Sequence, residues 1–411
     1  MTTIDTALRR DTTVIGVVGA AHFFSHFFQL ALPPLFPFLV VEFGVGYADL
    51  GLIPATFYLV SGICQALVGV WVDRYGARPV LLAGLTLLAV ATGLAGFATE
   101  FWMLLPLAAV AGVGNSVFHP ADLSILSTKV SPGRMGRAYS IHQLGGTLGY
   151  AASPVVILTM ALAFGWHTAI VLAGVIGLGM VGLLVASGDL IATEPGARSA
   201  RRAETPGPGA PPAVGYAALI ARPAMIMAFL YFLLSAAGGT AIQSFSIPAL
   251  KFLYGLPIEY ASVSLTVYLL ASACGIFLGG IVADRTDRRD RIAVGGTAAA
   301  TALMLLIASG VVGWAGALVA MAAAGFFMGA TAPSRDLIIR AATPKGATGK
   351  AFGFVYSGLD MGSTVIPVLV GTMVDQGLPQ AVFFTVAGLY ALTILTVLHI
   401  NRRPAEAGTV G

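Results

Sequence analysis

The segment GNSVFHPADLS, residues 114–124, places a histidine and an aspartate inside an otherwise apolar stretch of the chain. His119 and Asp122 are three residues apart, a spacing that puts both side chains on one face of a helix. The imidazole can relay protons to that carboxylate or tune it, or it can be a structural side chain bonded to the backbone. A carboxylate in so apolar a setting is costly unless it faces a partner or a water-filled cavity.

A second group of polar residues lies near the N-terminus, in the segment HFFSHFFQ. His22, His26 and Gln29 follow the spacing i, i+4, i+7 and therefore share one stripe of a helix. On a helix that lines a cavity, this stripe would contact a solute. Two histidines at i, i+4 can also bind zinc, but the sequence shows no third ligand, so we expect neither a metal nor a cofactor.

Other polar residues interrupt apolar segments farther along the chain. We expect Asn115, His119, Gln243 and Ser244 to complete the lining of the solute site, with His142 as a weaker candidate. Asp360 lies about ten residues into the apolar segment that contains VYSGLDMGSTV. A carboxyl group there either couples transport to protons or is a structural aspartate bonded to hydroxyl groups of its own helix.

The composition indicates that membrane-spanning helices position these residues. The chain has 411 residues, of which 57% are hydrophobic and only 10% are charged, whereas a soluble protein has about 25% charged residues. Apolar runs of about 20 residues, the length that crosses a bilayer as a helix, recur from end to end. The first run is too long for a cleaved signal peptide and lacks a cleavage site. We therefore predict an all-α integral membrane protein with transmembrane helices at residues 13–41, 50–72, 79–98, 102–128, 138–164, 167–187, 224–252, 260–283, 292–312, 315–339, 351–373 and 381–400.

The distribution of basic residues predicts the orientation of these helices. Nearly all of the 22 lysines and arginines fall at the termini or in alternate loops, and Lys251 and Arg335 are the exceptions. This bias indicates a multi-pass protein with an even number of helices and both termini in the cytoplasm. We expect its location to be the bacterial inner membrane. It also accounts for the net charge of +4 without nucleic acid as a partner.

A polar segment divides the chain into two six-helix parts. Residues 189–222 include ATEPGARSARRAETPGPGAPPAVG, which is rich in proline, glycine and alanine and is typical of a flexible linker. We therefore expect an N-terminal bundle at residues 1–188, a cytoplasmic linker at 189–222 and a C-terminal bundle at 223–411.

The two parts repeat each other. GVWVDRYGAR (69–78) aligns with GIVADRTDRR (280–289) at an offset of 211, and at an offset of 213 Gly145 aligns with Gly358 and Gly149 with Gly362. The glycine spacing predicts close helix packing. Duplicated halves in parallel are typical of transporters whose solute site lies between them, near the middle of the membrane.

The same offset of 213 aligns Asp122 with Arg335. One hypothesis is that the two side chains face each other across the pseudo-twofold axis. They would then form a cytoplasmic gate or place a cation for an anionic solute. The alternative is that both lie near loops and only extend toward the membrane surface.

Three motifs carry a resemblance to a known family. GVWVDRYGAR and its second copy resemble the loop motif of the major facilitator superfamily, and GGTLGYAASP (145–154) resembles that family's glycine-rich antiporter motif, with Ser153 in place of a glycine. SVFHPADLSILS and HFFSHFFQLALPPLFPFL are similar to the fosmidomycin-resistance subfamily. The resemblance implies a cytoplasmic latch in which Asp73 caps a neighbouring helix and pairs with an arginine. Its residues would be Gly69, Asp73, Arg74, Gly76, Arg78, Asp284, Arg285 and Arg289.

We therefore expect a secondary active transporter that works by alternating access as a monomer. The favoured direction is proton-coupled efflux of a small drug or metabolite, anionic or not, and the alternative is proton-symport uptake of an organic anion. Asp122, His142, Arg335 and Asp360 are the candidates for proton coupling or gating. The motifs HExxH and GxSxG are absent from the sequence, which disfavours an intramembrane enzyme, and the short termini disfavour a sensor.

Overall fold

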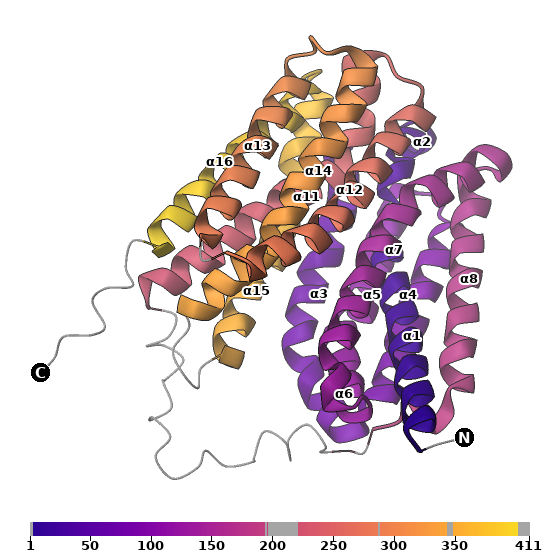
Figure 1. Ribbon diagram of the computed structural model, residues 1–411. Helices are drawn as coiled ribbons and strands as arrows, with labels where there is room; N and C mark the ends of the chain where they lie inside the picture. The colour runs from indigo at the N-terminus through magenta and orange to yellow at the C-terminus, as the bar shows by residue number, and fades with distance from the viewer. Residues whose placement is uncertain (1–2, 194, 196–220, 287, 343–347, 402–411) are drawn as a thin grey trace, which may run out of the picture. The chain divides into compact units, whose positions relative to one another are not determined.

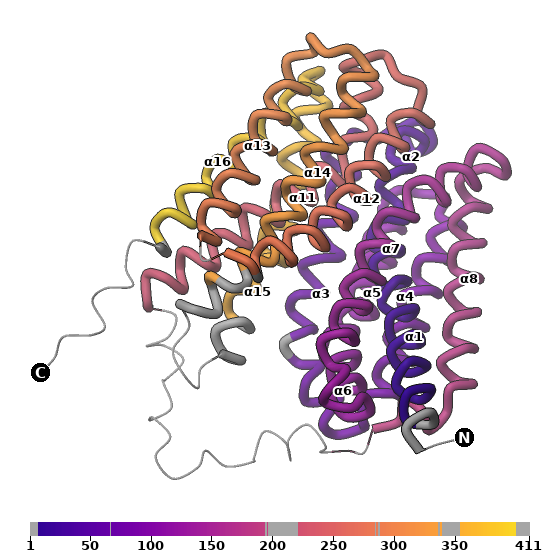
Figure 2. Tube along the Cα trace, in the orientation of Figure 1, coloured from indigo at the N-terminus to yellow at the C-terminus, as the bar shows by residue number. Residues whose placement is uncertain are grey.

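A computed structural model describes residues 3–193, 195, 221–286, 288–342 and 348–401. All of its regular elements in these ranges are helical (Figures 1 and 2). They are α1 (Thr3–Gln29), η1 (Pro33–Leu35), α2 (Phe36–Phe43), α3 (Tyr47–Tyr75), α4 (Ala77–Ala95), η2 (Phe101–Met103), α5 (Leu104–Asn115), α6 (Phe118–Lys129), η3 (Pro132–Arg134), α7 (Met135–Phe164), α8 (Trp166–Ala186), η4 (Gly188–Leu190), α11 (Pro223–Tyr254), α12 (Ile258–Asp284), α13 (Arg289–Ala308), α14 (Gly313–Ala342), α15 (Thr348–Asp375) and α16 (Gln380–Asn401).

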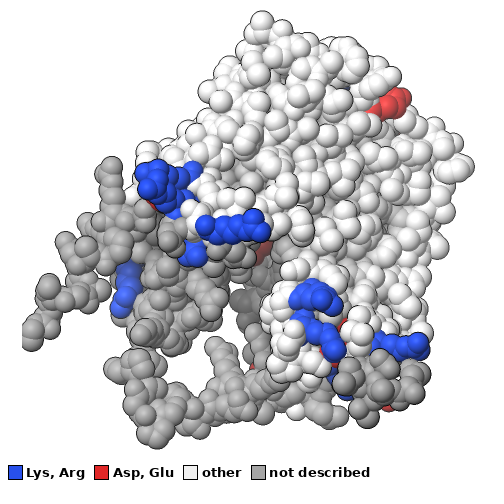
Figure 3. Space-filling model, in the orientation of Figure 1, with Lys and Arg blue, Asp and Glu red and all other residues white. Residues whose placement is uncertain are grey.

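Within the described ranges, 12 helical segments are long and apolar enough to cross a membrane. A helix satisfies its backbone hydrogen bonds internally, which is what a chain in hydrocarbon requires. The all-helical class with 12 spans that the sequence predicts is therefore confirmed. On the face shown in Figure 3, lysine and arginine side chains gather near helix ends, and the surface over the helices carries almost no charge.

The helices pack into two compact units, one of residues 1–45 and 52–205 and the other of residues 46–51 and 206–411. In the first unit, α1 packs against α7, and α4 packs against α8 and α5. In the second unit, α11 packs against α15 and α16, and α14 packs against α12 and α13. Most of the segment predicted to be a linker lies outside the described residues.

Two of the predicted single helices are interrupted. The first is divided into α1 and α2 just before Pro33 and Pro34, and the fourth is divided into α5 and α6 at Ser116 and Val117. Pro120 lies four residues after Ser116, and a proline ring collides with the carbonyl group four residues earlier while supplying no N–H. The interruption therefore falls one turn before the proline.

Glycines on α7 bring its backbone against α1. A Cβ atom on Gly145 would lie 2.5 Å from the carbonyl oxygen of Gly19, and a Cβ atom on Gly149 would collide with the carbonyl oxygen of Phe23. The packing role predicted for this glycine face is confirmed.

The second unit repeats the same contact. Gly358 and Gly362 of α15 approach the carbonyl groups of Phe229 and Leu233 on α11 equally closely. Gly149 contacts Phe23 in the first unit, and the equivalent Gly362 contacts Leu233 in the second. Phe23 therefore corresponds to Leu233, so the first helices of the two units align at an offset of 210. This correspondence allows their polar residues to be compared position by position.

Candidate functional site

The two polar stripes predicted from the sequence meet at Asp122, which is fully buried on α6. Its Oδ2 atom lies 3.1 Å from Nδ1 of His22 on α1. The same oxygen lies 3.1 Å from Nε2 of His142 on α7. One carboxylate therefore connects three helices of the first unit.

Two further histidines join this group. Nε2 of His26 lies 3.2 Å from Nε2 of His22, and the ring centre of His119 lies 5.2 Å from that of His22. The rings of His22 and His142 are stacked with their centres 3.6 Å apart. We call His22, His26, His119, His142 and Asp122 the histidine–aspartate cluster. It contains all but two of the chain's 6 histidines.

The hydrogen bonds of the cluster leave acceptor atoms in excess. An ionised Asp122 only accepts, so His22 donates from Nδ1 and His142 donates from Nε2. Nε2 of His22 then accepts from His26, and Nδ1 of His26 keeps a lone pair. That atom and Oδ1 of Asp122 are buried and have no hydrogen-bond partner among the described residues. The cluster is therefore suited to a cation or to a hydrogen-bond donor.

The members of the cluster differ in exposure, and His26 is partly buried. Asp122 and the rings of His22 and His142 are 0%, 2% and 6% exposed, whereas His119 is an exposed residue. A solute or an ion that reaches the cluster would therefore meet His119 first.

Gly146 on α7 makes room for the histidine rings. A Cβ atom at this position would lie 2.9 Å from Nε2 of His26 and 3.0 Å from Cδ2 of His22. Gly146 is not among the site residues predicted from the sequence. The available signals were its place beside Gly145 and its position one helical turn after His142.

A second polar network begins at Gln29 on α1. Its Oε1 accepts hydrogen bonds from the hydroxyl groups of Tyr58 and Tyr150. Its Nε2 donates to Oδ1 of Asn115 over 3.1 Å, and Nδ2 of Asn115 donates to Oγ of Ser61 over 2.9 Å. Gln29 and Asn115, each predicted as a site residue, are thus brought together. The hydroxyl partners were missed because they follow no pattern in sequence.

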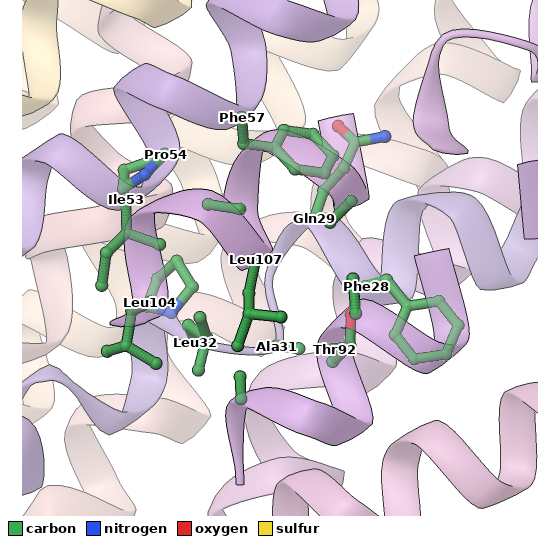
Figure 4. A pocket seen from close by; sticks show the side chains of 15 residues that line it. Phe28, Gln29, Ala31, Leu32, Ile53, Pro54, Phe57, Thr92, Leu104 and Leu107 are labelled. Carbon is green, nitrogen blue, oxygen red and sulfur yellow. The ribbon is translucent and has the colours of Figure 1, made fainter. Parts of the chain in front are cut away.

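Tyr150 joins the two groups, because its ring lies edge-on to His26 with the centres 4.3 Å apart. Gln29 also lines a pocket of about 40 Å³ in the first unit. Figure 4 shows that the other side chains around this pocket are mostly apolar, with Thr92 as a polar exception.

In the second unit, Arg335 on α14 has an aromatic environment. Its guanidinium carbon lies 4.5 Å from the ring centre of Phe232 and 5.8 Å from that of Tyr231. Asp122 corresponds to Arg335, and His22 corresponds to Phe232. In the first unit this contact joins the carboxylate of Asp122 to the imidazole of His22. In the second unit the equivalent contact joins the guanidinium group of Arg335 to the ring of Phe232. The pairing of Asp122 with Arg335 stays a prediction.

The remaining predicted residues of the second unit are not gathered into one site. Asp360 is partly buried on α15, and Gln243 and Ser244 lie on α11. Among the described residues, no side-chain hydrogen bond joins Asp360, Gln243 and Ser244 to one another. Their predicted roles stay predictions.

The motif GVWVDRYGAR forms the turn between α3 and α4. Gly76 has a φ of 84°, a conformation that favours glycine. The backbone N–H of Ala77 donates to Oγ1 of Thr193 over 2.7 Å, which caps α4. Arg78 donates to the carbonyl oxygen of Val185 over 3.0 Å. The motif thus ties the last turn of α8 and the segment after it to the start of α4.

The latch itself is not tested by these contacts. Arg74 lies 5.3 Å from the ring centre of Tyr75. In the second copy, Arg289 donates to the carbonyl oxygen of Ala283 over 3.4 Å. The side chain of Asp284 lies outside the described residues.

The chain is similar to known transporters along its length. A family model described as Major Facilitator Superfamily matches residues 18–317 and 232–410. The fosmidomycin resistance protein of Escherichia coli (strain K12) is 26% identical and covers 97% of this chain and 95% of its own length. The hexuronate transporter of Bacillus subtilis (strain 168) is 24% identical and covers 89% of each. A crystal structure of a bacterial homologue of the human lysosomal transporter Spinster, inward-facing and occupied, matches with a TM-score of 0.77 at 15% identity and covers 95% of this chain and 97% of that one.

Proposed function

Because the chain belongs to the Major Facilitator Superfamily, we propose that it exports a small anionic solute across the bacterial plasma membrane in exchange for protons. It is a membrane transporter of small solutes rather than an enzyme. In the proposal, the chain works by alternating access as a monomer with both termini in the cytoplasm, and the motif GVWVDRYGAR and its second copy act as the cytoplasmic latch.

The observation that carries the proposal is the histidine–aspartate cluster. Ionisable side chains inside membrane-spanning helices are rare and mark solute or ion pathways. Asp122 is buried between three helices, while His119 is exposed. A group that contacts His119 is therefore within reach of the buried members, and the network from Gln29 to Asn115 adds further polar side chains.

Arg335 supports an anionic solute. A guanidinium group within a membrane span is a ready partner for a carboxylate or a phosphonate, because it can donate two parallel hydrogen bonds. The aromatic rings of Tyr231 and Phe232 hold it in place through cation–π contacts. One relative is named for the transport of hexuronate, an anion.

Asp360 is the proposed proton-coupling residue. It is partly buried on α15, and among the described residues its carboxylate forms no ion pair. A carboxyl group without a fixed positive partner can take up and release a proton during the cycle. Asp360→Asn removes that ability and keeps the size of the side chain.

The test uses inverted membrane vesicles with an acid interior and a pH-quenched dye. A panel of phosphonates, organic acids and lipophilic drugs is added to vesicles that contain the wild type, Asp360→Asn or Asp189→Asn. Asp189 is an exposed aspartate after α8 and serves as the matched control. We expect recovery of the dye signal with an anionic member of the panel for the wild type and for Asp189→Asn, but not for Asp360→Asn.

Other results would correct the proposal in defined ways. Solute accumulation in right-side-out vesicles, with silence in inverted ones, would establish uptake by proton symport instead of efflux. Solute movement with no dye response would remove protons from the mechanism. Full coupling in Asp360→Asn would remove that residue from it.

A further inference from the structure

We propose that the histidine–aspartate cluster binds one divalent transition-metal ion of the zinc class. His22, His119 and His142 are the nitrogen ligands, and Asp122 orients or completes the set. This site goes beyond solute transport and does not depend on the direction of transport or on proton coupling.

The spacing of the nitrogen atoms carries the first step. One ring nitrogen from each of these three histidines lies within 4.8 Å of the other two. Zinc holds nitrogen ligands at about 2.0–2.1 Å in a tetrahedron, so its ligand atoms are about 3.4 Å apart. Closing the remaining gap requires the rings to move by roughly 1 Å. His119 is exposed and can rotate to supply most of that movement.

The second step is the position of Asp122. Metal-binding histidines usually donate their other ring N–H to a carboxylate, which fixes the tautomer and the ring orientation. Asp122 holds His22 through Nδ1 and His142 through Nε2 in this way. The opposite nitrogen of each ring, Nε2 of His22 and Nδ1 of His142, then carries the lone pair that a metal needs. At Nε2 of His22 the metal would take the place of the N–H of His26, which lies 3.2 Å away.

The third step is the balance of charge and acceptors. Oδ1 of Asp122 is buried without a hydrogen-bond partner among the described residues. Neutral imidazoles leave the carboxylate's negative charge uncompensated within a membrane span, which is costly. A divalent cation compensates it. Nitrogen ligands favour zinc, nickel or copper over magnesium or calcium, which prefer oxygen.

The rival explanation is a cluster of neutral histidines held only by hydrogen bonds. His119 separates the two explanations, because among the described residues its ring makes no hydrogen bond, yet it is one of the three nitrogen donors. His119→Ala therefore removes a metal ligand and leaves the hydrogen bonds of Asp122 in place. His399, exposed at the end of α16, is the matched control histidine.

The experiment measures Zn²⁺ binding to the full-length protein, purified in detergent without a polyhistidine tag. Competition with a chromophoric chelator gives affinity and stoichiometry, and Co²⁺ absorption reports the coordination. We expect one ion per chain for the wild type and for His399→Ala. We expect affinity about tenfold lower or worse for His119→Ala. His119→Cys should retain binding and add a thiolate-to-Co²⁺ absorption band, since cysteine is also a zinc ligand.

Two results would overturn the proposal. One is the absence of saturable Zn²⁺ binding to wild-type protein that is folded by circular dichroism and monodisperse by gel filtration. The other is equal affinity in His119→Ala and His399→Ala. Neither result involves a transport assay, so failure of the metal site is distinct from failure of the proposed transport function.

Discussion

Replacing Gly146 with alanine should disturb the histidine–aspartate cluster without adding or removing a polar group. The new Cβ atom would lie 2.9 Å from Nε2 and Cδ2 of His26 and 3.0 Å from Cδ2 of His22. Non-bonded carbon atoms settle about 3.5–4.0 Å apart, so both rings must move by about 0.5–1 Å. Helix α1 cannot take up this movement, because Gly145 and Gly149 hold its backbone against α7.

The displacement is large enough to break a hydrogen bond. Nδ1 of His22 lies 3.1 Å from Oδ2 of Asp122, and N–H to oxygen bonds extend to only about 3.2 Å. Loss of a hydrogen bond to a charged group costs about 1.5–3 kcal/mol. The higher helix propensity of alanine returns about 0.5–1 kcal/mol. We therefore expect Gly146→Ala to lower the free energy of unfolding by about 1–2 kcal/mol.

The assay is unfolding in mixed detergent micelles, followed by circular dichroism. Gly182→Ala is the control, because it lies on α8 of the same unit and a Cβ atom there meets nothing within 4 Å. The control should be neutral or slightly stabilising. Equal stability of the two variants would refute the reasoning that Gly146 makes room for the rings.

Three further outcomes are expected. Arg335→Gln should raise the KM for an anionic solute by about tenfold or more with little change for a neutral one, measured by vesicle uptake; equal effects on both would contradict recognition of charge. Thr193→Val should destabilise the first unit by about 1 kcal/mol in thermal melts, because Ala77 loses its cap. Asp11→Asn should cost about 1 kcal/mol, since Asp11 pairs with Arg134 over 2.6 Å; an unchanged melt would show that this pair is too solvated to matter.

Much of the fold follows from the sequence. Apolar runs of bilayer length predict helices because hydrocarbon permits few other backbone structures. The duplicated glycines predict close helix packing, which the contacts of Gly145 and Gly358 confirm, but not which helix is the partner. The interruption before Pro120 was harder to place, because a proline's ring affects the turn before it rather than its own position.

The sequence predicts which site residues share a helix face, but not which of these faces lie together in the site. Spacing along one helix places His22 and His26 on a common face, and likewise His119 and Asp122, but it does not show which faces of different helices meet. That information lies in the contacts between helices, here in the glycines that bring His142 on α7 toward α1. Hydroxyl partners such as Tyr150 lie among many similar side chains and carry no local signal.

The correspondence between the units also separates what duplication preserved from what it changed. The glycine contacts are present in both copies, whereas the positions equivalent to His22, His26, His119, Asp122 and His142 are Phe232, Ala236, Ala332, Arg335 and Val355. The first copy carries an acid–imidazole chemistry at these positions, and the second is apolar apart from one guanidinium. Tolerance to substitution should therefore be unequal: apolar exchanges at Phe232, Ala236, Ala332 and Val355 change only packing, while exchanges at His22, His26, Asp122 and His142 remove a charge or a hydrogen bond.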